Sequence, residues 1–219
     1  GDFEVGGDNS VTTDFHMGPW ESIRSIYPAC WGYCSWANRD ESAKSYKERE
    51  LVNNLIGTVA SGGQFAYNIG PKGDGTIDAF DAGVVTEVGQ WMARHPDAIT
   101  GARPTWYPAP NWGKVMTKGN DLYFFPELWS PGKTLTLPSV GGHVTAVTVD
   151  GTDRSLEFTQ DGTTLTVTMS GENPEPNLRP VVKVTFDSAP TYVPTQTVTA
   201  VDGATISSEQ FFGRASALR

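Results

Sequence analysis

The chain contains 219 residues, which is long enough for one or two domains with a hydrophobic core. It is acidic, with 25 Asp and Glu residues against 16 Lys and Arg residues and a net charge of -9. Nucleic acids and anionic membranes bind clustered cations, and the densest basic segment, residues 44–49, is interrupted by uncharged and acidic residues. We therefore expect neither of them as a partner. No apolar run approaches the roughly 20 residues of a membrane helix.

Residues 1–44 are rich in aromatic and loop-forming residues, while aliphatic residues are scarce. Aromatic faces stack on the apolar faces of sugar rings, whereas the aromatic residues of a core normally lie among aliphatic ones. We expect most of these rings to pack within the fold and a pair of them to contact a ligand. The aromatic residues are Phe3, Phe15, Trp20, Tyr27, Trp31, Tyr33 and Trp36.

The two cysteines, Cys30 and Cys34, lie close together in this segment. Four extended residue steps span about 13 Å, whereas the Cα atoms of a disulfide lie about 5.5–6 Å apart, so a bridge requires a bend, which Gly32 could supply. We expect two buried thiols, with a disulfide as the alternative. A structural zinc site needs four ligands, and the three histidines are scattered along the chain, so we expect no metal site.

The next segment has the pattern of an α/β fold. Ser45 and Glu48 have the spacing of a capping box, and apolar residues at 51, 52, 55, 56 and 59 predict a helix that ends at the glycine pair 62–63. Residues 64–69 are predicted to form a strand. A second helix is predicted over residues 78–94, and Pro96 stops it. A helix, a strand, a polar loop and another helix, in this order, indicate an α/β barrel or an open α/β sheet.

From about residue 101 the sequence changes to short Thr- and Val-rich runs separated by Gly, Pro and Asp clusters. Several runs alternate apolar and polar residues, and Asp161-Gly162 is a strong hairpin signal. This pattern predicts an antiparallel β-sandwich over residues 101–190. The tail, residues 191–219, is left unassigned apart from one strand at 197–201. The predicted sandwich strands are residues 114–117, 122–125, 134–137, 144–149, 155–158, 164–168 and 181–186.

A series of short motifs resembles one enzyme family in its order and spacing. The motifs are Gly1-Asp2-Phe3-Glu4, Pro19-Trp20-Glu21, Trp31-Gly32-Tyr33, Asn68-Ile69-Gly70-Pro71, Asp74-Gly75-Thr76-Ile77, Gly89-Gln90-Trp91 and Gly119-Asn120-Asp121-Leu122-Tyr123. Over roughly residues 1–150 the chain resembles the retaining α-L-fucosidases of glycoside hydrolase family 29. The resemblance implies that residues 1–100 are the last units of a catalytic (β/α) TIM-like barrel and that residues 101–190 are its C-terminal β-sandwich.

The resemblance also implies an activity and a partner. The expected enzyme is a secreted or extracytoplasmic exo-α-L-fucosidase that releases terminal L-fucose from fucosylated glycans and needs no cofactor. In family members the Asp nucleophile and most of the barrel lie upstream, and neither has a counterpart here. We therefore expect the N-terminal barrel portion of the same enzyme as a partner, and we expect this chain alone to be inactive.

Retaining hydrolysis needs two carboxyl groups about 5–5.5 Å apart, one acting as nucleophile and one as general acid/base. Family members place an acidic residue a few positions after an Asp-Phe pair. Here the pair at residues 2–3 is followed at once by Glu4, so the usual spacing is not kept. Glu4 is the predicted acid/base, with Asp8 and Glu21 as alternatives.

Two aromatic residues are the predicted substrate contacts. Trp31 aligns with an aromatic residue that in the family packs against the fucose methyl group, which favours a flat apolar wall. Its alternative is a core position. Trp20, in the motif with Glu21, is the second predicted contact.

Two other functions remain open from the sequence. The β-sandwich could be a carbohydrate-binding module without catalysis, which requires an exposed aromatic platform; the candidates are Trp106, Tyr107, Trp112 and Trp129. The chain could also be a structural piece that binds nothing until it joins the missing part of the barrel.

Overall fold

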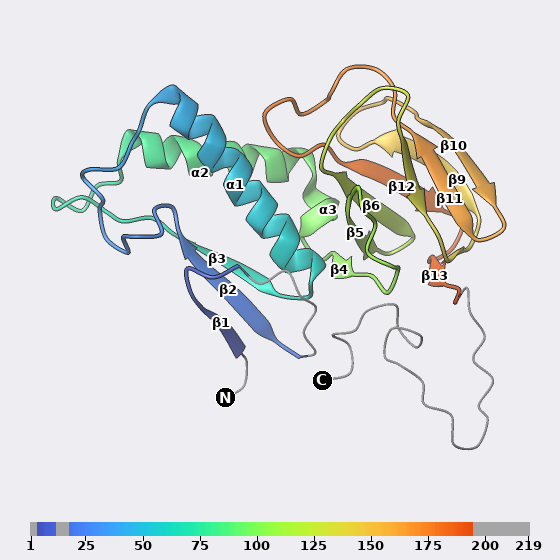
Figure 1. Ribbon diagram of the computed structural model, residues 1–219, viewed down its shortest axis with the longest axis horizontal. Coiled ribbons are helices and arrows are strands. Elements are labelled where there is room, and N and C mark those ends of the chain that lie inside the picture. The colour runs from blue at the N-terminus through green and yellow to red at the C-terminus, as the bar shows by residue number, and fades with distance from the viewer. Residues whose placement is uncertain (1–3, 12–17, 195–219) are drawn as a thin grey trace.

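The computed structural model describes residues 4–11 and 18–194. Its first part is a three-stranded parallel sheet in the order β1-β2-β3, with β1 at Glu4–Asp8, β2 at Trp20–Ser25 and β3 at Gln64–Asn68. The helices α1, Glu41–Ala60, and α2, Ala79–Arg94, lie side by side above this sheet (Figure 1). The mixed α/β class is confirmed, while β1 and β2 occupy a segment that was predicted to be mainly loop.

Helix α1 begins earlier than the sequence predicted. Its N-cap is Asp40, whose carboxylate accepts a hydrogen bond from the amide of Ala43 at 2.8 Å. The predicted capping box at Ser45 is wrong, because Ser45 lies inside the helix, where its backbone amide already has an intrahelical partner. The helix ends where predicted, with Gly62 in the left-handed region at φ 91°.

Helix α2 agrees with its prediction. Asp78 is the N-cap and accepts a hydrogen bond from the amide of Phe80, and the helix ends at Arg94. Pro96, predicted only as a stop, also begins the short helix α3, Pro96–Ile99, because proline is well suited to a first helical position. Among the described residues, none of the helices is long and apolar enough to cross a membrane.

The second part of the chain consists of antiparallel sheets, as predicted. A five-stranded sheet has the order β4-β5-β6-β12-β9, a three-stranded sheet has the order β10-β11-β7, and β13 pairs with β8. The bounds are β4 Arg103–Pro104, β5 Gly113–Lys118, β6 Asp121–Pro126, β7 Thr134–Leu137, β8 Val140–Gly141, β9 Val144–Val149, β10 Glu157–Asp161, β11 Thr164–Thr168, β12 Val182–Phe186 and β13 Thr191–Tyr192.

The two-residue strands β4, β8 and β13 were not predicted, because two residues are too few to show a periodic pattern. The strand predicted at 155–158 is shifted to β10, Glu157–Asp161, next to the Asp161-Gly162 turn. The strand predicted at 197–201 lies outside the described residues.

Two hydrophobic cores hold these parts. One core fills the space between the five-stranded and three-stranded sheets, and its buried residues come from both. The other lies under α1 and α2 and also includes Met116, Tyr123 and Phe125 of the first antiparallel strands, with Leu178 and Val181 of a later loop. The core of the α/β part therefore extends across the boundary predicted at residue 100.

Candidate functional site

The three parallel strands end at one edge of the sheet, where the segments after β1 and β2 are tied together. The side chain of Asn9, just beyond β1, accepts a hydrogen bond from the amide of Ser25 at 2.7 Å and donates one to the carbonyl of Pro28 at 2.9 Å. In α/β barrels the site is built at the C-terminal ends of the strands. This edge is therefore the candidate site.

Asn68, the last residue of β3, fixes the loop that follows β2. Its Nδ2 donates to the carbonyl of Trp31 at 2.8 Å and to Oγ of Ser25 at 3.1 Å. Close backbone packing adds to this restraint, because a Cβ on Gly70 would overlap the peptide between Gly32 and the next residue. The motif that contains Asn68 and Gly70 thus acts as a support for the loop above it.

The same loop is closed by a disulfide between Cys30 and Cys34, whose Cα atoms are 5.9 Å apart. The expectation of two buried thiols is wrong, because the chain does not run extended between them. The amide of Cys30 donates to the carbonyl of Tyr27 at 2.8 Å, and the backbone bends at residues 31 and 32. This reversal brings the two sulfurs within bonding reach.

Arg39 lies beneath the loop and connects it to α2. Its Nη1 donates to the carbonyl of Cys34 at 2.8 Å, and its guanidinium lies 3.3 Å from the carboxylate of Asp81. The guanidinium also lies over the rings of Tyr27 and Tyr33, at 4.9 and 4.7 Å from their centroids. The hydroxyl of Tyr27 donates to the buried Asp81 at 2.8 Å. Burial, and after it this hydrogen bond, raise the pKa of Tyr27, which therefore donates as a neutral phenol.

The disulfide loop presents aromatic side chains to solvent. Trp31 is 41% exposed and Trp36 is 70% exposed. The core alternative for Trp31 is therefore not what this structure shows. The backbone on both sides of Trp31 is held by a disulfide, by Asn68 and by close packing. Trp31 therefore presents an exposed aromatic ring from a restrained loop at the C-terminal ends of the strands, where the sites of α/β barrels form.

Trp20 is in a different environment. It is the first residue of β2, is buried, and packs so closely on Gly63 that a Cβ there would lie 2.5 Å from the indole ring. It lies at the opposite end of the strand from Trp31. This location supports a packing role for Trp20 rather than the predicted contact with substrate.

The three candidate acidic residues occupy different positions along their strands. Glu4 begins β1 and pairs with Trp20, while Glu21 pairs with Val5, so both lie at the N-terminal ends of their strands. Because neighbouring residues of a strand point to opposite faces, the side chains of Glu4 and Glu21 also lie on opposite faces of the sheet. Asp8 ends β1 at the site edge, about 10 Å along the sheet from Glu4, because β1 bulges between Val5 and Asp8 and Asp8 pairs with Ile23.

The sequence predicted Trp31 as a candidate substrate contact, but it did not predict the residues that hold its loop. Asn9, Ser25 and Arg39 lie in the segment that was predicted as mainly loop, and no local pattern marks their partners. Asn68 could have been found from the sequence, because it lies near the C-terminal end of the strand predicted over residues 64–69 of an α/β unit. Among the described residues, no group of three His, Cys, Asp or Glu side chains is arranged to hold a metal ion.

The fold and the site define a mixed α/β protein whose parallel sheet carries the site at its C-terminal edge and is followed by antiparallel sheets. Residues 1–97 match the family model described as alpha-L-fucosidase. The chain is 30% identical over 148 residues to the tissue alpha-L-fucosidase of Rattus norvegicus, a match covering 65% of this chain and 31% of that protein. It is 28% identical over 187 residues to the alpha-L-fucosidase of Dictyostelium discoideum, covering 77% and 38%.

The fold agrees with these matches. The crystal structure of the alpha-L-fucosidase from Vibrio sp. strain EJY3 superposes with a TM-score of 0.76 at 23% identity, covering 87% of this chain and 33% of that one. The chain is thus similar to the alpha-L-fucosidase family of glycosidases, glycoside hydrolase family 29, as the motifs predicted. It spans about a third of the length of the curated relatives that it matches.

Proposed function

We propose that this chain is the C-terminal part of a retaining exo-α-L-fucosidase that releases terminal L-fucose from fucosylated glycans. The observation that carries the proposal is the exposed Trp31, held by a disulfide and by Asn68 at the C-terminal edge of a parallel sheet. L-Fucose is a 6-deoxy sugar whose C6 is a methyl group. A rigid aromatic face is suited to recognising that methyl group.

The test of this assignment compares two sugars on one enzyme. In the enzyme that joins this chain to an upstream barrel segment, Trp31→Ala should weaken binding of fucose by about 1–3 kcal/mol more than binding of the analogue that lacks the C6 methyl. Trp36→Ala is the control, since Trp36 is exposed on the same loop. An equal loss for both sugars in the Trp31 variant would show that Trp31 does not contact the methyl.

For the general acid/base, the strand positions favour Asp8 over Glu4 and Glu21, because only Asp8 ends its strand at the site edge. The sequence, by contrast, placed Glu4 before Asp8. In the complete enzyme, Asp8→Asn should slow substrates with poor leaving groups far more than activated aryl fucosides, and azide should restore rate with the activated substrate. If Glu4→Gln or Glu21→Gln behaves this way and Asp8→Asn does not, the assignment is wrong.

The upstream barrel portion would supply the nucleophile and the rest of the pocket. Within the described residues β1 and β3 are the two edge strands of the parallel sheet, and a closed barrel has no edges. This supports a partner segment that continues the sheet. The pure chain should not hydrolyse an aryl α-L-fucoside, because one carboxylate cannot carry out double displacement. Hydrolysis of this substrate by the pure chain would contradict the proposal that its active site is incomplete.

The alternative, a carbohydrate-binding β-sandwich, has less support. Of its four aromatic candidates, Tyr107 is buried, and the indole N–H groups of Trp112 and Trp129 are bonded to backbone carbonyls of the sandwich itself. Only Trp106 is strongly exposed, and one ring is a small platform. Binding of immobilised fucosylated glycans by the chain alone, abolished by Trp106→Ala, would favour this alternative.

The proposal includes a secreted or extracytoplasmic location. The Cys30–Cys34 disulfide supports it, since disulfides persist mainly in oxidising compartments. Alkylation of the native protein before reduction should leave both cysteines unmodified, whereas modification of both thiols would contradict this part of the proposal.

A further inference from the structure

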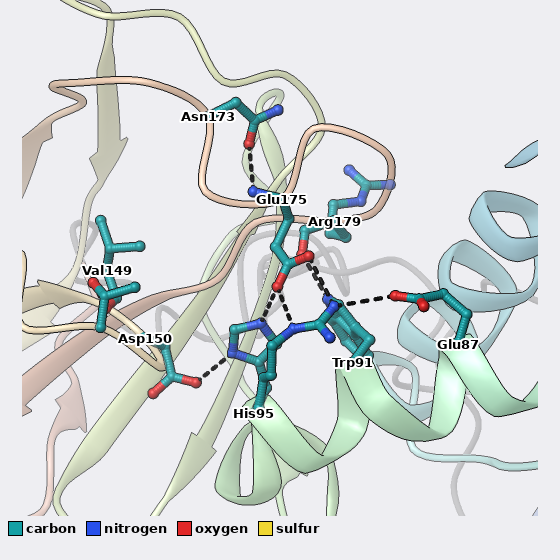
Figure 2. Close-up of polar contacts among 10 residues, drawn as sticks. Glu87, Trp91, His95, Val149, Asp150, Asn173, Glu175 and Arg179 are labelled. Carbon is teal, nitrogen blue, oxygen red and sulfur yellow. Dashed lines mark hydrogen bonds and ion pairs between the residues drawn. The ribbon is translucent and has the colours of Figure 1, made fainter.

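A buried histidine lies where the helices meet the antiparallel sheets. His95 is the C-cap of α2 and is 2% exposed. Its Nδ1 lies 2.7 Å from a carboxylate oxygen of Asp150, and its Nε2 lies 3.3 Å from one of Glu175 (Figure 2). Both ring nitrogens therefore face acceptors.

The two carboxylates come from separate segments of the β part. Asp150 directly follows β9, and its amide donates to the carbonyl of Val181 at 2.9 Å. Glu175 belongs to the loop between β11 and β12, and its amide donates to Oδ1 of Asn173 at 3.0 Å. The backbone of each acidic residue is thus held by a hydrogen bond that does not involve His95.

The same loop is fastened to both long helices. Nε1 of Trp91 on α2 donates to the carbonyl of Arg179 at 2.9 Å, and the guanidinium of Arg179 donates to Oδ1 of Asn53 on α1 at 2.8 Å. Trp91 also lies edge-on to the imidazole of His95, with 5.2 Å between ring centroids. His95 is therefore at the centre of the contact between the loop and the helices.

The charges around His95 favour its protonated form. On α2, Arg94 makes hydrogen bonds of 2.8 and 3.0 Å to the carboxylate of Glu175, and it also contacts Glu87. The carboxylates of Glu87 and Glu175 thus contact one guanidinium, whereas that of Asp150 contacts the imidazole of His95. A neutral imidazole would also present one lone pair to a carboxylate, which is repulsive, whereas the imidazolium donates from both nitrogens.

Other charged or titratable groups on the packed elements are engaged elsewhere. Asp97 of α3 lies 2.6 Å from Nζ of Lys118 on β5. Tyr123 of β6 is buried, and burial together with nearby carboxylates raises its pKa, so it stays neutral. Neither Asp97 nor Tyr123 provides a hydrogen bond to the imidazole.

We propose that His95 is a proton-dependent clamp, in which an imidazolium bridging Asp150 and Glu175 holds the β part against α1 and α2, and loss of its proton loosens this contact. The inference does not depend on the proposed catalytic activity, because every group in it belongs to the described chain.

The direction of the pH dependence follows from the shifts. Burial lowers the pKa of His95, but the hydrogen bonds and charges of Asp150 and Glu175 outweigh it, so the pKa is raised above 6.5. Its stabilisation is complete below the unfolded value of about 6.5 and is lost as pH rises through the folded value. Burial raises the pKa of Glu175, but His95 and Arg94 outweigh it and lower the pKa, so that stabilisation is lost at acidic pH.

The first test follows the titration of His95 itself. The imidazole of His95, followed by NMR in the whole chain and assigned by its loss in His95→Gln, should titrate above the ordinary value of about 6.5. Asp150→Asn should move the midpoint down. Asp153→Asn, an exposed carboxylate in the same turn, is the matched control and should leave the midpoint unchanged. A midpoint at or below 6.5 in the unaltered chain would overturn the proposal.

The second test measures the contact itself. Hydrogen exchange of residues 91–95 and 173–181, corrected for the intrinsic rate, should show protection that falls about tenfold between about pH 6 and about pH 9. Asp150→Asn should already lack most of this protection at about pH 6, whereas Asp153→Asn should behave as the unaltered chain. Protection that is independent of pH, or lost equally in the control, would show that the contact does not depend on the His95 proton.

Discussion

Replacing Asp81 by Asn should loosen the loop that contains the Cys30–Cys34 disulfide, because Asp81 binds Tyr27 and Arg39, which support this loop. The substitution keeps the size of the side chain and removes its charge. Asp81 is 1% exposed, accepts a hydrogen bond from Tyr27, and pairs with Arg39, which in turn holds the carbonyl of Cys34. The loss should therefore be felt both in overall stability and in the disulfide loop.

The magnitude follows from the geometry. Breaking a buried ion pair by removing one partner costs about 3–5 kcal/mol, and a hydrogen bond to a charged group contributes about 1.5–3 kcal/mol. In this variant Arg39 keeps one acidic neighbour, because the carboxylate of Asp78 lies 3.6 Å from its guanidinium and compensates part of the positive charge. We therefore expect Asp81→Asn to lower the free energy of unfolding by about 2–3 kcal/mol, or the melting temperature by roughly 5–10 °C.

Urea and thermal unfolding would measure this loss. Asp97→Asn is the control, because its pair with Lys118 is exposed and should contribute less than about 1 kcal/mol. Hydrogen exchange of residues 27–39 should rise in the Asp81 variant at temperatures well below unfolding. If Asp81→Asn costs no more than the control and leaves this exchange unchanged, the cluster does not support the loop.

Two further substitutions test local features of the fold. Gly70→Ala should lower the free energy of unfolding by about 1–3 kcal/mol in chemical denaturation, because its methyl group would overlap the backbone at Gly32. The control Gly73→Ala should have little effect, because a methyl group there meets no neighbouring atom. Equal effects of the two substitutions would contradict the close packing at Gly70. Asp40→Ala should lower the melting temperature by about 2–4 °C through loss of the N-cap, and Ser45→Ala should leave it nearly unchanged. A larger loss of melting temperature in Ser45→Ala than in Asp40→Ala, measured by calorimetry, would instead support the capping box that the sequence predicted.

The local periodicity of the sequence determined most of the regular elements. Apolar spacing predicted α2 and the end of α1, and alternation predicted the main strands of the antiparallel sheets. These signals are reliable because each element must bury one face, so its pattern is written in consecutive residues. The motifs likewise identified the fucosidase family, and Trp31 as its candidate sugar contact.

Pairing between distant residues was decided only by the tertiary structure. The segment of β1 and β2 contains glycines and charged residues, and it becomes a sheet because parallel neighbours supply its hydrogen bonds. The Cys30–Cys34 disulfide depends on a reversal that the extended-chain estimate did not include.

The same limit applies to the polar networks. His95 is an ordinary histidine after a predicted helix in the sequence, and its meaning comes from Asp150 and Glu175, which lie 55 and 80 residues further along the chain. Asn68 is similar, since its partner Trp31 lies 37 residues earlier. A burial pattern records whether a residue is inside, but the partner of a buried polar group is set by which segments the packed core brings together.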